Sequence, residues 1–155
     1  LMVFVRPSIW ANMIGCTIID EDGRFVGQTL PRSHFAVSVK PGKHLFVSWA
    51  ENADALHADV EEGKTYFVEV ATSMGVGSAN FHLYALKPGS DHWNDQAEWM
   101  RITQQFMSDR LAGDAYYRQN RPEDVADRMQ SAKEQFKAYE NTDLERRMLR
   151  PTDGL

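Results

Sequence analysis

The first ninety residues consist of short β-prone segments separated by turn sequences at regular intervals. They hold ten of the eleven valines and eight of the ten glycines; valine favours strands, and glycine favours the turns between them. Turn signals occur at Asp22-Gly23, Pro41-Gly42 and Glu62-Gly63. The pattern predicts eight strands, at about residues 2–6, 14–20, 24–30, 34–40, 44–50, 55–60, 65–71 and 80–86. Such spacing is typical of an antiparallel β-sandwich or barrel.

The remaining residues have a different composition, with one valine and ten of the seventeen lysines and arginines in residues 91–155. This region predicts two α-helices, at about residues 91–112 and 122–149, with Gly113 capping the first and Pro122 opening the second. Their apolar stripes are Trp99, Ile102 and Phe106, and then Val125, Met129, Ala132, Phe136 and Tyr139.

These patterns together predict a mainly β fold. It is an antiparallel β-sandwich of seven or eight strands, followed by two C-terminal α-helices that pack on one sheet face. The expected domain organisation is a sandwich domain at residues 2–88 and a helical extension at residues 89–155.

One turn-and-strand segment occurs twice: VKPGKHLFVSW, residues 39–49, is followed by VEEGKTYFVEV, residues 60–70. Because side chains alternate along a strand, each copy can be divided into two faces. The expected core face carries Leu45, Val47 and Trp49 in the first copy, and Tyr66, Val68 and Val70 in the second. Phe46 and Phe67 then lie on the outer faces, which should be polar if they met water.

The two outer phenylalanines require a cover, because monomeric proteins seldom leave such apolar patches exposed. We expect at least one C-terminal helix to cover Phe46 and Phe67 through Trp99, Phe106 or Phe136. A partner protein is the alternative cover, which makes Phe46 and Phe67 candidate contact residues.

Trp10 is the third candidate contact residue. It lies in the loop sequence SIWANM after the first expected strand. An exposed loop tryptophan can stack on a sugar ring or anchor a partner protein. Ordinary packing is the competing interpretation, since tryptophan is rarely fully buried.

The sequence contains no recognisable catalytic, cofactor or metal-binding motif. The five histidines are His34, His44, His57, His82 and His92. Their spacing gives no metal-ligand pair, and the Gly-Lys pairs of the repeat open strands rather than the helix that a phosphate-binding loop requires. The single cysteine, Cys16, lies in an apolar run and is expected to be buried and inert. We therefore predict a protein that is not an enzyme.

Charge and hydropathy argue against two further classes of protein. The net charge of −5 opposes nucleic-acid binding, which normally needs a cationic surface. No apolar run approaches the roughly 20 residues of a transmembrane helix.

Four motifs occur in an order that resembles a known family: VFVRPS (3–8), DEDGRFVGQT (20–29), VSVKPGKHLF (37–46) and DVEEGKTYFVEV (59–70). The series resembles a domain of unknown function from bacterial cell-envelope lipoproteins, and its turns are similar to those of PEGA-type repeats and transthyretin-like small sandwiches. The resemblance covers about residues 2–87. It implies a non-catalytic module in the periplasm or cell envelope, whose lipid-bearing cysteine would lie upstream of this chain.

Three functional hypotheses follow. The first is a non-catalytic binding or structural module of the bacterial cell envelope that acts through contact with a partner protein or a second copy. The second is a carbohydrate-binding module that uses Trp10 and other loop aromatics to bind a glycan. The third is an enzyme with a cleft that collects histidines and carboxylates.

Overall fold

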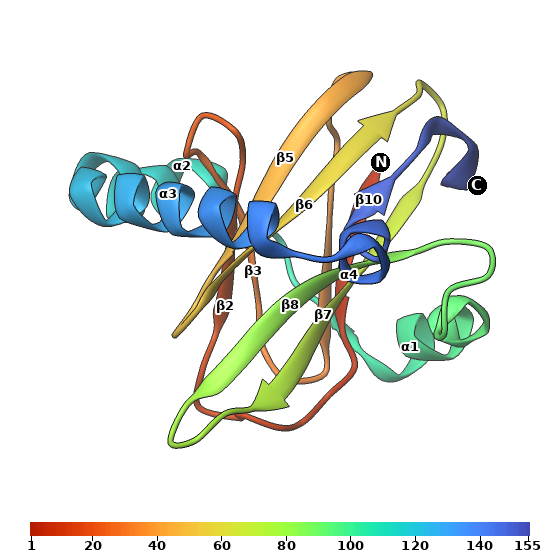
Figure 1. Ribbon diagram of the computed structural model, residues 1–155, viewed down its shortest axis with the longest axis horizontal. Coiled ribbons are helices and arrows are strands. Elements are labelled where there is room, and N and C mark those ends of the chain that lie inside the picture. Colours follow the sequence, from red (N-terminus) through yellow and green to blue (C-terminus); the bar gives the residue numbers. More distant parts are fainter.

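Two five-stranded β-sheets face each other in the computed structural model, which describes all residues 1–155, and helices lie outside them (Figure 1). The strands are β1 (Met2–Arg6), β2 (Cys16–Ile19), β3 (Phe25–Thr29), β4 (Ser33–Val37), β5 (Gly42–Trp49), β6 (Ala53–Val60), β7 (Tyr66–Met74), β8 (Ala79–Leu86), β9 (Gln104–Gln105) and β10 (Met148–Leu149). Sheet A has the order β8-β7-β1-β4-β9, and sheet B has the order β10-β6-β5-β2-β3.

The C-terminal part contains four α-helices and three shorter helical turns rather than two long helices. The elements are η1 (Trp93–Asp95), α1 (Gln96–Ile102), α2 (Arg110–Asp114), η2 (Ala115–Gln119), α3 (Pro122–Ala138), α4 (Asn141–Glu145) and η3 (Pro151–Asp153). None of these helices combines the length and apolar character needed to span a bilayer.

The predicted fold class, an antiparallel sandwich of seven or eight strands with two helices, is wrong. Eight of the ten strands agree with the expected positions, but both sheets are mixed. β1 runs parallel to β7, and the two-residue strands β9 and β10 run parallel to β4 and β6. Turn signals report only strands that are neighbours in sequence, whereas the β1–β7 pair joins Met2 to Tyr66.

The first expected helix is interrupted because its middle forms strand β9. The backbone N–H of Gln104 donates to Arg32 O at 2.8 Å, and that of Phe106 donates to His34 O at 2.9 Å. Gly113 is not a helix cap but lies inside α2, where a Cβ atom would overlap the ring of Phe25. A tight contact with sheet B, rather than the end of a helix, therefore explains this glycine.

The second expected helix ends eleven residues early, at Ala138, because the residues that follow form other elements. Its last part forms α4 and then β10, which pairs with β6 at His57 and Ala58. The tail thus supplies one strand to each sheet. Independent folding of residues 2–88 stays a prediction, although both sheets include strands from outside that range.

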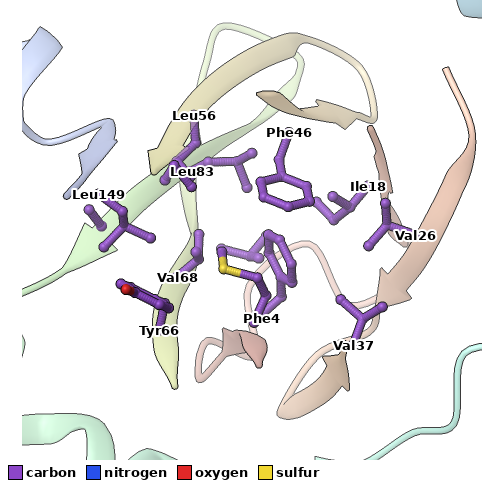
Figure 2. Packing of buried hydrophobic residues seen from close by; sticks show 14 of the residues in the cluster. Phe4, Ile18, Val26, Val37, Phe46, Leu56, Tyr66, Val68, Leu83 and Leu149 are labelled. Carbon is purple, nitrogen blue, oxygen red and sulfur yellow. The ribbon is translucent and has the colours of Figure 1, made fainter. Parts of the chain in front are cut away.

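The space between the sheets is filled by a core of nineteen buried residues. Phe4 stacks on Phe35 with ring centroids 5.1 Å apart and meets Phe46 edge-on at 5.3 Å. Figure 2 shows Phe46 pointing from its strand toward Phe4 in the middle of this core. Cys16 belongs to the same core, and burial raises the pKa of its thiol to about 12, so the thiol stays protonated near neutral pH.

The outer face of sheet B is covered by α3, which packs across β5 and β6 (Figure 1). The helix buries Val125, Met129 and Ala132, as its apolar stripe predicts. Their partners on β5 are Val47 and Trp49.

The assignment of Phe46 to the outer face is therefore wrong. Both faces of β5 are buried, so alternation separates its side chains into two apolar sets without telling which set points inward. On β7 the assignment is right, since Tyr66 and Val68 lie in the interior core and Phe67 lies half-buried outside. The two phenylalanines of the repeat consequently have opposite environments.

The free edge of β8 is hydrogen-bonded by side chains from the start of β6. Asn52 Oδ1 accepts from the N–H of Phe81 at 2.6 Å, and Asp54 Oδ2 accepts from the N–H of Leu83 at 2.9 Å. The Glu51 carboxylate accepts from the N–H of Ala79, and the carbonyl of Arg146 accepts from that of Ala85 at 2.7 Å. Four alternate amides of this edge are therefore satisfied.

Candidate functional site

The candidate functional site is a group of exposed apolar side chains at one end of the sandwich, here called the apolar loop end. Its members are Ile9, Trp10, Met13, Leu30, Met74 and Val76. They lie on or beside the β1–β2, β3–β4 and β7–β8 connections, which meet at the bottom of the molecule in Figure 1. Trp10 is 68% exposed, Met13 91% and Met74 75%. Such a cluster on a folded chain is a common mark of an interaction surface.

The β1–β2 loop is held by Arg6, the last residue of β1. Its guanidinium is fully buried and donates to three loop carbonyls: those of Ile14 at 2.7 Å, Trp10 at 2.7 Å and Ala11 at 2.9 Å. It also lies over the ring of Phe81 at 4.8 Å. Burial lowers the pKa of Arg6, and no carboxylate forms an ion pair with it. The buried guanidinium therefore holds the backbone of the Trp10 loop in place.

A second set of contacts ties this loop to β7. Ser8 Oγ accepts hydrogen bonds from the N–H of Trp10 and the hydroxyl of Thr72, each at 3.0 Å. Ala11 has a φ of 55°, a left-handed conformation that costs energy in a residue other than glycine. Trp10, Ala11 and Met74 line a hollow of about 190 Å³, and room for one large apolar side chain is thus formed beside Trp10.

The apolar loop end is nearly free of charge. The connections at this end, residues 7–15, 30–32, 50–52 and 75–78, contain only Arg32 and Glu51 as charged residues. The Glu51 carboxylate is engaged with the backbone of β8. This end therefore offers apolar contact without a cationic surface.

The three predicted contact residues lie in different environments. Trp10 is exposed, as a contact residue must be. Phe46 is 1% exposed in the interior core and cannot meet a partner. Phe67 is half-buried on the outer face of sheet A, away from the apolar loop end, and its role as a contact stays a prediction.

The five histidines have separate sets of neighbours. His34 bonds Thr103 at 2.7 Å, His44 bonds Glu21 at 3.2 Å, and His57 packs on Phe136. No three His, Cys, Asp or Glu side chains lie close enough together to hold a metal ion.

His82 lies beside a buried ion pair that joins the tail to both sheets. Asp54 and Arg147 are 0% and 2% exposed, and Arg147 Nε donates to Asp54 Oδ1 at 2.9 Å. The hydroxyl of Tyr139 donates to the same carboxylate at 2.7 Å. Burial alone would raise the pKa of Asp54, but the contacts with His82, Arg147 and Tyr139 outweigh it and hold the pKa below its usual value. The cluster has a structural role.

His92 lines a cleft of about 550 Å³ on the outer face of sheet A, here called the Glu69 cleft. Its floor includes Glu69 and Tyr84, and its walls are the loop at residues 87–92 and α4. Burial raises the pKa of Glu69, and the nearby His92 and Arg146 only partly oppose this shift. Asp95 and Asp91 raise the pKa further.

We expect Glu69→Gln to stabilise the protein slightly at neutral pH. A carboxyl whose pKa is raised by folding gives full stability below its unfolded pKa and loses stability as the pH rises through the folded value. The Tm of the variant should exceed that of the wild type at about pH 7, and the gap should close toward about pH 4. An equal gap at both pH values would contradict this expectation.

Sequence reasoning missed most of these features. Asp54 gave one usable signal, because it shares a strand face with Leu56 and is thus a charged residue at an inward position. Arg146 gave none, since its segment resembles a continuing helix. Arg6 belongs to the Arg-Pro motif of the resemblance, but only the fold reveals that it fixes the Trp10 loop.

Comparison of the chain with protein-family models, with curated proteins and with solved structures gave no match.

Proposed function

We propose that the protein is a non-catalytic binding module that docks a partner protein through the apolar loop end, with Trp10 as the anchor. The observation that carries this proposal is the group of six exposed apolar side chains on three adjoining connections. Tryptophan and methionine are enriched in protein interfaces, and a tryptophan often dominates the binding energy. The backbone of Trp10 is already fixed by Arg6, so binding loses little loop entropy.

The neighbours of Trp10 favour a protein partner over a glycan or a membrane. A glycan site needs several free hydrogen-bonding side chains around its aromatic platform. The hydroxyls of Thr72 and Ser73 beside Trp10 already bond Ser8 and His82, and the exposed methionines offer none. A peripheral membrane surface usually combines apolar with basic residues. Arg32 is the one basic residue of these connections beside the buried Arg6.

The location of this module follows only from the motif series described above. We propose the periplasm or cell envelope, because the Arg-Pro, Asp-Gly and Pro-Gly motifs resemble those of envelope lipoproteins. An envelope module would meet its partner outside the cytoplasm.

A photo-crosslinking experiment tests the docking surface. We expect p-benzoylphenylalanine at position 10 to capture one partner protein in cells that make the full-length protein. The matched control is the same residue at Tyr116, an exposed aromatic outside the apolar loop end. With the purified partner, Trp10→Ala should weaken binding by about 2 kcal/mol or more, or roughly thirtyfold in Kd. Its Tm should match the wild type, because the side chain is exposed.

Other results would redirect or reject the proposal. Identical crosslinks at positions 10 and 116, or none at either, would reject it. A crosslink to a second copy of the chain would identify a homodimer. Sedimentation of the purified protein with phospholipid vesicles, or binding to a glycan array that Trp10→Ala abolishes, would replace the protein partner with a lipid surface or a carbohydrate.

A further inference from the structure

Some charged groups of the Glu69 cleft are fully used by the protein itself. Lys87 Nζ donates to two backbone carbonyls at 2.8 and 2.9 Å. Both carboxylate oxygens of Glu145 accept from Arg150 Nη2, at 2.7 and 2.8 Å. His92 Nδ1 lies 2.9 Å from the carboxylate of Asp95. Lys87 and Glu145 therefore have little left to offer a ligand, whereas His92 keeps Nε2 free.

Two oppositely charged groups remain unused. Glu69 is partly buried, and its carboxylate makes no hydrogen bond or ion pair with the protein. The guanidinium of Arg146 makes no hydrogen bond either, and its one ionic contact is Asp91 at 3.8 Å, a side chain 80% exposed. No ion pair joins Glu69 to Arg146, so a ligand can lie between them.

Arg146 is well positioned to receive a ligand. Its carbonyl accepts from the N–H of Ala85, which fixes the backbone against β8. Its guanidinium stacks over the ring of Tyr84 at 4.2 Å, so the plane of the group is held while its N–H donors stay free. Glu69 and Tyr84 are direct cross-strand neighbours, and this places carboxylate and guanidinium on the same small area of sheet A.

We propose that the Glu69 cleft binds a small zwitterion, whose ammonium group donates to the Glu69 carboxylate and whose carboxylate accepts from the Arg146 guanidinium. A purely cationic ligand would leave Arg146 facing a like charge, and a purely anionic ligand would do the same to Glu69. One molecule that carries both charges satisfies both groups. The strongest reason is that these two oppositely charged side chains line one cleft and that neither makes a hydrogen bond with the protein.

The size and lining of the cleft indicate what lies between the two charged groups of the ligand. A volume of about 550 Å³ is larger than the two charged groups need, and Tyr84, Leu86 and Pro88 contribute carbon surface to the lining. The ligand therefore has an apolar body between or beside its charges. This is the chemistry of a free apolar amino acid or of a short apolar peptide.

Calorimetric titration of the full chain with defined probes tests the proposal. The probes are L-leucine, L-phenylalanine and the dipeptide leucyl-leucine, which distinguish the two sizes of zwitterion. We expect at least one of them to bind. Its N-acetyl and its amide derivative, each lacking one charge, should bind at least about tenfold more weakly. If no probe binds, if the blocked derivatives bind equally well, or if neutral saccharides bind instead, the proposal is wrong.

Two variants assign the binding to the two residues. Glu69→Gln and Arg146→Gln should each weaken binding of the best probe at least about tenfold while the protein stays folded. The matched control is Glu98→Gln, which removes an exposed carboxylate of α1 paired with Arg101, and it should leave the affinity unchanged. Wild-type affinity in Glu69→Gln, with its Tm confirming a folded protein, would overturn the assignment.

Discussion

Replacing Arg147 with methionine should lower the free energy of unfolding by about 3–5 kcal/mol and the Tm by roughly 6–20 °C. The substitution leaves the carboxylate of Asp54 buried without its cationic partner, which is among the most destabilising changes a core can undergo. It also removes the stacking of the guanidinium on Tyr139 at 3.8 Å. Urea denaturation followed by circular dichroism would measure the change.

The loss of stability in Arg147→Met should depend on pH. Because the folded pKa of Asp54 is lowered in the wild type, the stabilisation from the ion pair is present above the unfolded pKa of aspartate. It is lost as the pH falls through the folded value. In Arg147→Met the carboxyl can protonate more readily, so the stability difference from the wild type should narrow toward acid pH.

An exposed arginine provides the control for this prediction. Arg150 forms an equally short pair with Glu145, but both side chains are about half exposed. Solvent screens such a pair, so Arg150→Met should change the stability little. If Arg147→Met cost no more than Arg150→Met, the structural role assigned to the buried pair would be wrong.

The second large effect is expected at the repeated phenylalanines. Phe46→Ala should destabilise the protein by about 3–5 kcal/mol, because it opens a cavity beside Phe4 in the interior core. Phe67→Ala, at the equivalent position of the second copy, should cost clearly less, because that ring is partly exposed outside sheet A. Thermal unfolding of the two variants in parallel measures the difference.

This comparison tests directly whether Phe46 points into the core while Phe67 points away from it. Equal losses of stability would mean that Phe46 and Phe67 have equivalent environments, as the sequence repeat alone predicts. A larger loss for Phe67→Ala would contradict the position of β5 in the fold.

Local sequence patterns were sufficient for the individual strands and insufficient for their assembly. Turns such as Asp22-Gly23 and the alternation of Tyr66 and Val68 encode short-range geometry, which is why β1 to β8 lie close to their expected positions. The parallel pairing of Met2 with Tyr66 depends on contacts between distant segments. Two-residue strands such as β9 are too short to produce a pattern at all.

The candidate sites, too, could be predicted from the sequence only where they depend on a single segment. Trp10 could be found because an apolar aromatic in a loop is unusual, and the fold then added the neighbours from the β7–β8 connection. Glu69 shares the outer face of β7 with Phe67, but its companion Arg146 comes from a tail segment that resembled a helix. A cleft that combines residues 69 and 146 can be recognised only when the tail is seen lying on the sheet.

The side chains that occupy the edge of β8 also affect how this protein behaves at high concentration. An open strand edge is a template for another chain, and it leads to strand exchange and fibrillar aggregation. Here Asn52 and Asp54 occupy the amides that an incoming strand would need. Sheet A therefore cannot grow by adding a strand to β8.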